Sequence, residues 1–415
     1  MSGVPGRKTN RRLSLFLIAL FLVAAGCSGP DSTDSVQSVG SCEGKTEVSF
    51  DHPYCKAKNE YGDLFCRIYE RLATGSIIVD GDDQEDYGDT MAYCCALIYT
   101  WEKMGMAEPW ELEFAGDLAQ CYKRRVDRFR ANPLVILLDT NMAMEVYIGV
   151  LGLLLAHEAG ADPEALQYVD AYFDTMFEIT GLFGPLIYSI PIPPYGPTTI
   201  MAGLAGMLLH YPLASQGEGR SPERLEQGLA VLAEMDRMVW DESMGGYRYL
   251  ATDRHSYEYQ YSNATTIQAL VRAYHLTGDP AFLERAEVVA EGLEVLYSER
   301  YGGYFASDES YSRAPHSGEA YIALSGQNYT IFADLLLYQT TGQQVYLDRA
   351  LGLFDFVRKR LWVEEEDLIY HDIQHGLLAD WYCTGCNWQF AYNIVLLDHV
   401  QQGIDLLPPA PDLGR

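Results

Sequence analysis

Two stretches of the chain are near copies of one another, and they constrain the fold more than any other feature of the sequence. Ala273-Tyr-His-Leu-Thr-Gly-Asp-Pro-Ala-Phe-Leu-Glu-Arg-Ala286 resembles Leu337-Tyr-Gln-Thr-Thr-Gly-Gln-Gln-Val-Tyr-Leu-Asp-Arg-Ala350. Each stretch contains the end of one helical pattern, a glycine that stops it, and the start of a second helical pattern. An internal repeat of this kind predicts a fold built from stacked helical hairpins.

Apolar residues recur with the helical period along the rest of the chain, and two kinds of helix alternate. Amphipathic segments lie near 57–72, 110–130, 162–180, 221–240, 280–298 and 344–361. Segments that are apolar on most faces, and are therefore expected to be buried, lie near 88–105, 140–160, 197–214, 262–278, 325–342 and 386–403. We expect an all-α fold, an (α/α)6 barrel of six helical hairpins with amphipathic helices outside. An open helical solenoid is the alternative, since linear repeats give the same pattern.

The connections between these helices are unequal in length. Turns from an inner to an outer helix are short, as at Gly278-Asp-Pro280. Connections from an outer to an inner helix are long, at roughly 73–87, 131–139, 181–196, 241–261, 299–324 and 362–385. Long loops in a compact domain usually carry function. We therefore expect the functional site at the end of the barrel where the inner helices begin.

The N-terminus has the pattern of a bacterial lipoprotein signal. A basic segment with Arg11 and Arg12 precedes an apolar run at 13–25, which is shorter than the roughly 20 residues that a membrane-spanning helix needs. The run ends in small residues and Gly26-Cys27, where the cysteine would be acylated and become the first residue. An ordinary signal peptide, with Cys27 incidental, is the alternative. We expect a lipid-anchored protein of the cell envelope, on its periplasmic or outer-surface face.

The sequence divides into four parts on this basis. They are the signal peptide at 1–26, a flexible Ser-, Asp- and Gly-rich tether at 27–41, the barrel at 42–407 and a tail at 408–415. The formal net charge of −29 argues against a nucleic-acid partner, because the long-range field of the protein repels phosphate.

Nine cysteines are present, and eight remain if Cys27 carries lipid. An even number in an exported protein predicts disulfides, although the sequence does not choose the pairs. Most of the eight are therefore expected to be oxidised.

The glycine-rich turns that follow two outer helices carry a family resemblance. Trp240-Asp-Glu-Ser-Met-Gly-Gly-Tyr247 and, one hairpin later, Tyr301-Gly-Gly-Tyr-Phe305 resemble the six-hairpin glycosidase superfamily, with the N-acylglucosamine 2-epimerase-like branch most similar in texture. The resemblance implies an (α/α)6 barrel and a carbohydrate-active enzyme, because members include glycoside hydrolases and sugar epimerases. The histidine motifs of the epimerases do not align securely with this chain, so no catalytic residue is transferred from them.

Candidate lumen residues follow from the register of the repeat. Counting back fifteen residues from the glycines that end the inner helices reaches Glu145, Asn263, Gln327 and Trp388. Glu145 lies in an otherwise apolar helix, and burial would raise the pKa of a carboxyl there, which suits a general acid. The alternative is a structural glutamate bonded to a neighbouring helix end.

Hydrolysis of a glycosidic bond needs two carboxyl groups, about 5–5.5 Å apart in retaining enzymes and about 6.5–9.5 Å apart in inverting ones. Asp139 precedes the second inner helix, where a helix cap is the plainer interpretation. We rank Asp139 and Glu145 first, then Glu319 and Asp372. Further acidic residues of the same loops are Asp89, Asp253, Glu258 and Asp308.

Tyrosines are unusually frequent in two of the long loops. The chain has 30 tyrosines, and Tyr247 and Tyr257 are among those that precede the fourth inner helix. Aromatic rings with a polar edge suit the faces of sugar rings, although they also fill helical cores. We therefore predict Tyr247, Tyr257, Asn263, Gln327 and Trp388 as substrate-binding residues.

Two segments have the composition of metal sites, although the prediction is an enzyme without a cofactor. The acidic loop Asp80–Asp89 could hold calcium, but a solvated loop explains it as well. His371, His375, Cys383 and Cys386 have zinc-ligand types, and disulfides are the more ordinary interpretation. A thioredoxin-like role for Cys383 and Cys386 is disfavoured, because no βαβ pattern surrounds them.

These patterns together predict an envelope-anchored carbohydrate-active enzyme that hydrolyses a glycosidic bond with paired carboxylates. Its partners would be a glycan or oligosaccharide and, through lipid on Cys27, a membrane. One alternative is a sugar epimerase that uses the loop histidines His255, His316 or His371 as proton carriers. The other is a non-catalytic glycan-binding surface lipoprotein.

Overall fold

The structure is a computed structural model, and it describes part of the chain. The described residues are 61–74, 96–98, 100–101, 107, 109–131, 140–183, 197–248, 251, 259–306, 322–374, 377–378 and 382–414. Contacts divide the chain into two units, Met1–Ser41 and Cys42–Arg415, and all of the described residues belong to the second. Cys27, the tether and the acidic loop Asp80–Asp89 lie outside the described residues.

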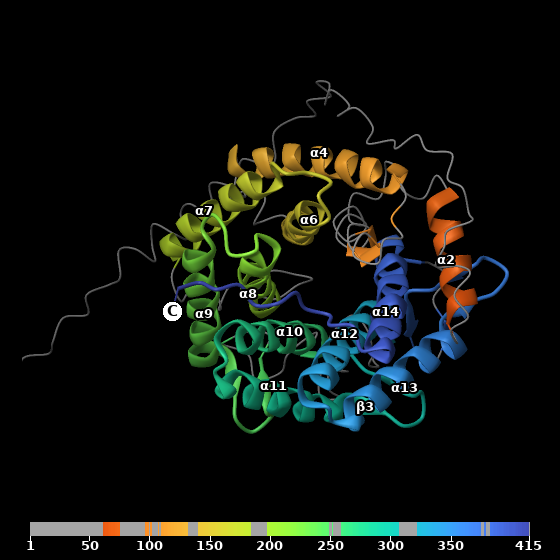
Figure 1. Cartoon of the computed structure of the whole chain (residues 1–415). Helices are drawn as coiled ribbons and strands as arrows, with labels where there is room; N and C mark the ends of the chain where they lie inside the picture. Colours follow the sequence, from red (N-terminus) through yellow and green to blue (C-terminus); the bar gives the residue numbers. More distant parts are fainter. Residues whose placement is uncertain are drawn as a thin grey trace, which may run out of the picture. The chain divides into compact units, whose positions relative to one another are not determined.

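Long helices form two concentric layers around one axis (Figure 1). The described inner helices are α6 (Thr140–Glu158), α8 (Pro197–Ala214), α10 (Tyr259–Thr277), α12 (Leu324–Thr341) and α14 (Thr384–Gln402), and each packs against the next in this order. The outer helices are α2 (Gly62–Thr74), α4 (Pro109–Ala131), α7 (Ala165–Phe183), α9 (Ser221–Val239), α11 (Pro280–Leu293) and α13 (Gln344–Arg360). Residues 96–98 and 100–101 are also helical, within the first predicted inner segment.

The ring of helices closes, because the first outer helix contacts the last inner one. Tyr69 of α2 packs edge-on against Trp388 of α14, with 5.9 Å between ring centroids. Arg67 of α2 forms an ion pair with Asp367, which follows α13. Contacts between the two ends of the repeat array exclude an open solenoid. The (α/α)6 barrel expected from the sequence is confirmed.

The two layers differ because their sequences bury different fractions of their surfaces. On α12, which is apolar on most faces, twelve residues from Leu324 to Leu337 are buried. The outer helix α9 buries one stripe, including Leu225, Leu232 and Met235, and exposes charged residues on its other side. A helix that is apolar all round has to be surrounded by protein, whereas an amphipathic one can face water.

Glycines end the inner helices and repeat the same local geometry. Gly278 and Gly342 adopt left-handed conformations with φ of 70° each, which a residue without a Cβ adopts at little cost. Thr277 and Thr341 precede them, and each hydroxyl accepts a hydrogen bond of 3.2 Å from the backbone N–H two residues on. The internal repeat in the sequence therefore corresponds to a repeated turn.

Short antiparallel hairpins connect outer helices to inner ones. β1 (Trp240–Asp241) pairs with β2 (Gly246–Tyr247), β3 (Tyr297–Ser298) with β4 (Gly303–Tyr304), and β6 (Trp362–Val363) with β7 (Leu368–Ile369). The one-turn helix η4 (Glu294–Leu296) links α11 to β3. A further sheet joins β5 (Ile322–Ala323), β8 (Asp372–Gln374) and β9 (Leu377–Leu378).

The opposite end of the barrel, where the inner helices end, is crossed by the C-terminal segment (Figure 1). The His275 imidazole lies 2.7 Å from the backbone oxygen of Pro408, and the Gln339 amide exchanges hydrogen bonds with Ile404 and Leu406. The segment predicted as a tail therefore packs on the barrel from its first residue.

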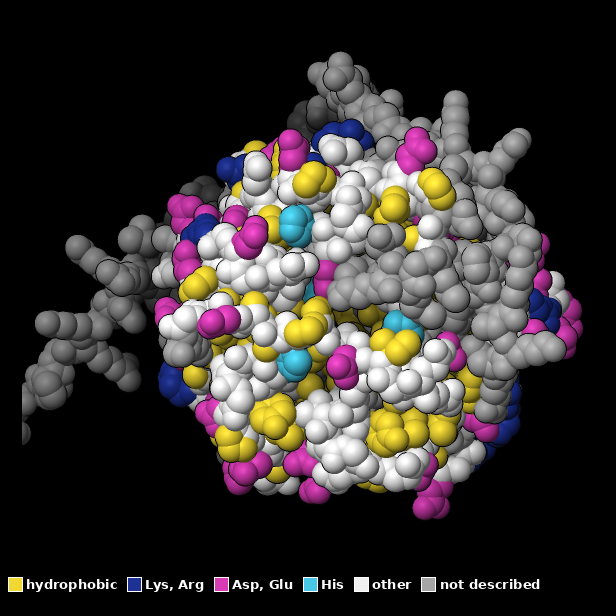
Figure 2. Space-filling view, viewed as in Figure 1, with side chains coloured by type: hydrophobic (Ala, Val, Ile, Leu, Met, Phe, Trp, Pro, Cys, Tyr) yellow, Lys and Arg dark blue, Asp and Glu magenta, His cyan; other side chains and the backbone are white. Residues whose placement is uncertain are grey.

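On the face in Figure 2, histidines lie toward the middle and carboxylates are most frequent around the rim. No helix among the described residues is long and apolar enough to cross a membrane.

Candidate functional site

The last long connection, between α13 and α14, folds onto the N-terminal ends of two inner helices. Its strand β8 pairs with β5, with Asp372 opposite Ala323 and Ile373 opposite Ile322. The N–H of Leu324, the first residue of α12, donates a 2.6 Å hydrogen bond to the backbone oxygen of His371. Asp372 is thereby fixed opposite the residue that caps α12. The positive end of a helix dipole favours anionic groups at this position.

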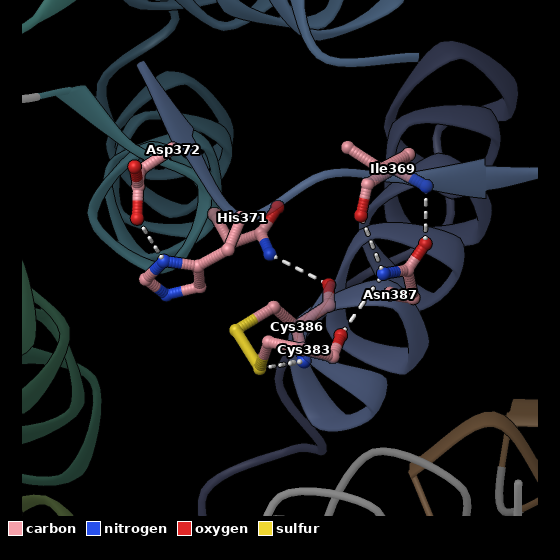
Figure 3. Close-up of a disulfide and its surroundings, with 7 residues drawn as sticks. Ile369, His371, Asp372, Cys383, Cys386 and Asn387 are labelled. Atoms are coloured by element: carbon pink, nitrogen blue, oxygen red, sulfur yellow. Dashed lines mark hydrogen bonds and ion pairs between the residues drawn. A yellow bond between two sulfur atoms is a disulfide. The ribbon is translucent and has the colours of Figure 1, made fainter. Parts of the chain in front are cut away.

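Asp372 and His371 form a side-chain pair at this end of the barrel (Figure 3). Oδ2 of Asp372 lies 2.9 Å from Nδ1 of His371. Asp372 is only 1% exposed, and among the described residues its Oδ1 has no hydrogen-bond partner. A carboxylate on one ring nitrogen fixes the orientation of the imidazole and directs its other nitrogen to a reacting group or a ligand. The pair therefore has the form of an acid–base site.

A disulfide lies beside this pair, at the first turn of α14. Cys383 is the N-cap residue and is bonded to Cys386, and the Cys383 sulfur accepts a 3.0 Å hydrogen bond from the Cys386 N–H. Cys66 is disulfide-bonded as well. The cysteines whose bonding the structure describes are thus oxidised. Cys383 and Cys386 pair with each other, a choice that the sequence left open.

Buried polar side chains join the inner helices below this level. Gln260 of α10 donates to the Thr330 hydroxyl of α12 at 3.1 Å, and the Gln327 amide lies 3.3 Å from the Gln260 oxygen. Thr199 of α8 and Ser262 of α10 share a 2.6 Å hydrogen bond. These side chains satisfy one another within the wall of the barrel, so they hold the inner helices in register.

Several predicted site residues lie where the structure does not describe them. Asp139, Glu319, Tyr257 and His375 lie outside the described residues. Glu145 is in α6, near its N-terminus as predicted, but the position of its side chain is not described. Of the four predicted catalytic carboxylates, the structure therefore places the side chain of Asp372 alone.

The other predicted substrate-binding residues have framework contacts instead. The Asn263 amide bonds both the N–H and the C=O of Tyr247, at 2.8 and 3.0 Å. Tyr247 is fully buried and donates its hydroxyl to Asp236. The Gln327 amide bonds Tyr304 in the same way, and Trp388 is buried against α2. The polar side-chain atoms of Asn263, Tyr247 and Gln327 are thus bonded within the framework of the barrel.

Sequence reasoning did not single out Asn387, whose place in α14 corresponds to that of Asn263 in α10 and Gln327 in α12. Its Oδ1 accepts from the Ile369 N–H at 2.8 Å, and its Nδ2 donates to the Ile369 oxygen at 2.9 Å. The carboxamide type was the available signal. Counting back fifteen residues from Gly403 missed it, because the last inner helix is one residue longer after this position and the count reached Trp388.

Comparisons with solved structures find the same fold. A sugar epimerase from a ruminal bacterium has a TM-score of 0.54 at 12% identity, covering 83% of this chain and 100% of its own. The unsaturated glucuronyl hydrolase of Bacillus sp. GL1, described as responsible for glycosaminoglycan degradation, has a TM-score of 0.55 at 14% identity, covering 85% and 97%. Cellobiose 2-epimerase from Bacillus thermoamylovorans B4167 has a TM-score of 0.55 at 11% identity, covering 80% and 99%.

No family model and no curated protein matches the sequence. The three similar structures share the fold of the six-hairpin glycosidase superfamily, so the resemblance of the Gly-Gly-Tyr turns is confirmed for the fold. Their printed activities are of two kinds, hydrolysis and epimerisation. At these identities the structural similarity establishes the barrel fold, and the reaction has to be inferred from the residues of the site.

Proposed function

We propose that this chain is a carbohydrate-active enzyme that hydrolyses a glycosidic bond at the end of the barrel where the inner helices begin. The observation that carries the proposal is Asp372, a carboxylate fixed at the N-terminal end of α12, 1% exposed, with one oxygen on His371 and the other without a partner among the described residues. A buried carboxylate oxygen without a partner among the described residues can accept a hydrogen bond from a ligand. Similar folds whose printed activities are on sugars support the substrate class.

Asp372 supplies one carboxyl of the pair that glycoside hydrolysis needs. We propose that the second comes from Asp139, Glu145 or Glu319, which the sequence places in the loops and inner helix of the same barrel end. One group would protonate the leaving-group oxygen, and the other would activate water or attack the sugar. A general acid or base of this kind contributes roughly 10²- to 10⁴-fold to the rate.

The His371–Asp372 pair favours epimerisation as the second candidate. An imidazole held by a carboxylate can take a proton from carbon on one face of the sugar, while a second acid on the opposite side gives a proton to the other face. The two reactions differ in their products. Hydrolysis releases a new reducing end, whereas epimerisation exchanges a carbon-bound hydrogen with solvent.

The test is an assay of the purified full chain against a panel of oligosaccharides, in water and in deuterium oxide. We expect new reducing ends from the wild type, and a loss of roughly 10²- to 10⁴-fold in Asp372→Asn. Glu365→Gln is the matched control, because Glu365 is an exposed carboxylate of the same connection. Circular dichroism checks that each variant keeps its helices.

The outcomes separate the candidates. Deuterium incorporation without bond cleavage replaces hydrolysis by epimerisation. An Asp372→Asn variant as active as Glu365→Gln removes the catalytic assignment of Asp372. If the protein binds glycans but shows neither activity, the remaining alternative is a non-catalytic glycan-binding protein.

We also propose that lipid on Cys27 holds the enzyme at the cell envelope. The Gly26-Cys27 junction after the apolar run supports this proposal. Cys27→Ala should move the protein from the membrane fraction to the soluble fraction and abolish labelling with palmitate. Unchanged fractionation and labelling would exclude the lipoprotein.

A further inference from the structure

Three side chains with soft or borderline metal-ligand atoms meet beside the first turn of α14. A ring nitrogen of His371 and the sulfurs of Cys383 and Cys386 all lie within 4.8 Å of one another. Cys383 and Cys386 are 6% and 3% exposed, and His371 is partly buried. The sulfurs are joined in a disulfide, and in that form they offer no thiolate to a metal.

We propose that reduction of the Cys383–Cys386 disulfide creates a binding site for a zinc-like divalent cation, with His371 as the third protein ligand. This inference goes beyond the proposed function, and it does not depend on the sugar chemistry. Two thiolates and one imidazole leave a fourth position open to water or another ligand, which is a known arrangement of zinc sites that are not purely structural.

Reduction of the Cys383–Cys386 disulfide requires an external reductant, which is a thiol or a phosphine. The reductant supplies two electrons, the S–S bond breaks, and the sulfurs take up two protons from solvent as thiols. Metal binding then displaces those protons, since only thiolates coordinate the ion. The sulfurs can separate to about 3.8 Å, as two tetrahedral ligands with Zn–S bonds of about 2.3 Å require.

The position of the cysteines on α14 favours the thiolate form after reduction. Cys383 is the N-cap residue of a helix of 19 residues, and its sulfur already accepts the Cys386 N–H. A helix N-terminus stabilises negative charge on such an atom. The site is therefore prepared to hold the two charges that a divalent ion neutralises.

Asp372 fits the role of a positioning residue for this site. It holds Nδ1 of His371 at 2.9 Å, so the ligand atom of the ring would be Nε2. Metal-binding histidines commonly donate their other N–H to a carboxylate, which orients the ring and increases its basicity. Asn387 holds the first turn of α14 from the other side, because its Nδ2 also donates to the Cys383 oxygen at 2.9 Å.

The test compares oxidised and reduced full-length protein in titrations with Co²⁺ and then Zn²⁺. A phosphine is the reductant, because a dithiol would compete for the metal. We expect one equivalent of Co²⁺ to give the thiolate charge-transfer band and the intense visible bands of a tetrahedral site in the reduced protein only. Zn²⁺ should displace it, and a chromophoric chelator should measure its affinity.

Variants separate this site from the other cysteines that reduction exposes. Cys383→Ser and His371→Ala should each weaken Zn²⁺ binding at least about 100-fold, and Asp372→Asn should weaken it about 10- to 100-fold without changing the stoichiometry. His399→Gln is the matched control, because His399 is in the last turn of the same helix, about 20 Å away along its axis.

Three results would overturn the proposal. They are equal metal binding by oxidised protein, unchanged binding by Cys383→Ser or His371→Ala, and loss of the helical circular dichroism signal on reduction. The last result would mean that the reduced protein no longer holds the three ligands together. Glycan turnover does not enter any of these measurements, so a failure here is distinguishable from a failure of the proposed enzyme activity.

Discussion

The side-chain amide of Asn387 hydrogen-bonds both the N–H and the C=O of Ile369, so that one inner-helix side chain holds one hairpin strand at two points. Asn263 bonds Tyr247 in the same way, and Gln327 bonds Tyr304. A buried backbone N–H or C=O that lacks a partner is costly. The three carboxamides therefore fasten the outer-to-inner connections to the wall of the barrel.

Replacing Asn263 by Leu should lower the free energy of unfolding by about 2–4 kcal/mol, because two buried backbone groups of Tyr247 lose their partners. Urea denaturation measures the change. Gln344→Leu is the control, because the Gln344 amide is exposed and bonds Asp348 within its own helix. The control should change stability by less than about 0.5 kcal/mol. Equal effects in the two variants would show that the carboxamide bonds contribute little.

The sequence was sufficient to predict the alternation of helices, because the difference between an all-round apolar helix and an amphipathic one is a local property. It identified the glycine-rich turns Gly245-Gly246-Tyr247 and Gly302-Gly303-Tyr304, which belong to two of the three hairpins that directly follow outer helices, but it did not predict their paired strands. The third was missed, since Asp367 adopts the left-handed conformation there, with φ of 56°, where the other two have glycine. An aspartate in a left-handed turn gives a weaker signal than two glycines.

The candidate site was predicted only in its position and residue types. The long connection at 362–385 does carry Asp372 and His371 to the start of the inner helices. That Asp372 would orient His371 depends on the pairing of β8 with β5, and that Cys383 would bond Cys386 depends on the side-chain geometry of the first turn of α14. The burial of Tyr247 could not be predicted either. This tyrosine lies in a loop sequence and is fully buried because the loop folds against α9 and α10.

Gly292→Ala should destabilise the fold by about 1–3 kcal/mol, because a Cβ there would lie 2.6 Å from the backbone oxygens of Met244 and Gly245. Neither oxygen can move without displacing the β1–β2 turn. Gly352→Ala is the matched control in another outer helix, where a Cβ meets nothing within 4 Å. That substitution should be neutral or stabilise by up to about 1 kcal/mol. Thermal unfolding of both variants makes the comparison, and similar melting temperatures would contradict it.

Arg349→Met should cost about 3–5 kcal/mol, because Arg349 of α13 pairs with the buried Asp334 of α12. The same guanidinium donates to the backbone oxygen of Ala290 and to Glu294, at 3.1 and 2.8 Å. Its removal leaves a buried carboxylate without its counter-charge. Chemical denaturation measures the loss, and a value below about 1 kcal/mol would show that water or another residue replaces the arginine.

The same variant should respond to pH in a defined direction. Burial raises the pKa of Asp334 from 3.8 to about 6, against the opposing charge of Arg349. Between these values the folded chain holds a proton that the unfolded chain releases. The stability that this proton contributes is present below 3.8 and is lost as the pH rises through about 6. Without Arg349 the pKa rises further, so the destabilisation by Arg349→Met should be smaller at about pH 4.5 than at about pH 7.5. An equal loss at both values would contradict the buried-carboxylate explanation.

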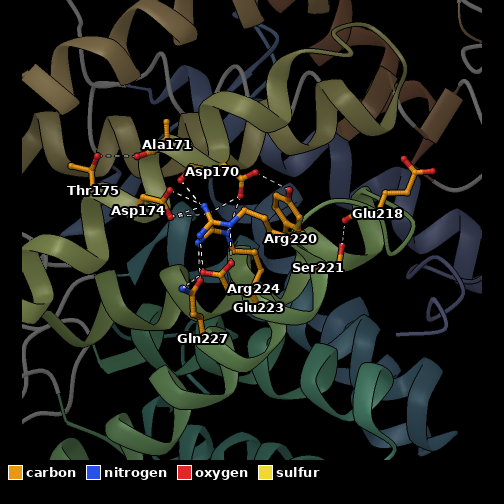
Figure 4. Close-up of polar contacts among 11 residues, drawn as sticks. Asp170, Ala171, Asp174, Thr175, Glu218, Arg220, Ser221, Glu223, Arg224 and Gln227 are labelled. Atoms are coloured by element: carbon orange, nitrogen blue, oxygen red, sulfur yellow. Dashed lines mark hydrogen bonds and ion pairs between the residues drawn. The ribbon is translucent and has the colours of Figure 1, made fainter. Parts of the chain in front are cut away.

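Two arginines at the start of α9 bind the same aspartate of α7 but differ in burial (Figure 4). Arg224 is fully buried and donates to Asp170 at 2.7 and 2.9 Å and to Asp174 at 3.0 Å. Arg220 is exposed to 36% and binds Asp174 and Glu223. Hydrogen bonds from Arg220 and Arg224 lower the pKa of Asp174 against the opposing effect of desolvation.

Arg224→Met should therefore destabilise the barrel much more than Arg220→Met. In the first variant, Asp170 loses the buried guanidinium that joins α9 to α7, and we expect a loss of about 3 kcal/mol. In the second, the carboxylates of Asp174 and Glu223 remain hydrated, so we expect a loss of at most about 1 kcal/mol. Raising the salt concentration to about 1 M should remove most of the Arg220 contribution and leave most of the Arg224 contribution, since screening acts on exposed charges. Urea denaturation at low and high salt makes both comparisons. If the two substitutions had equal effects at both salt concentrations, burial of Arg224 would not be what stabilises this pair of outer helices.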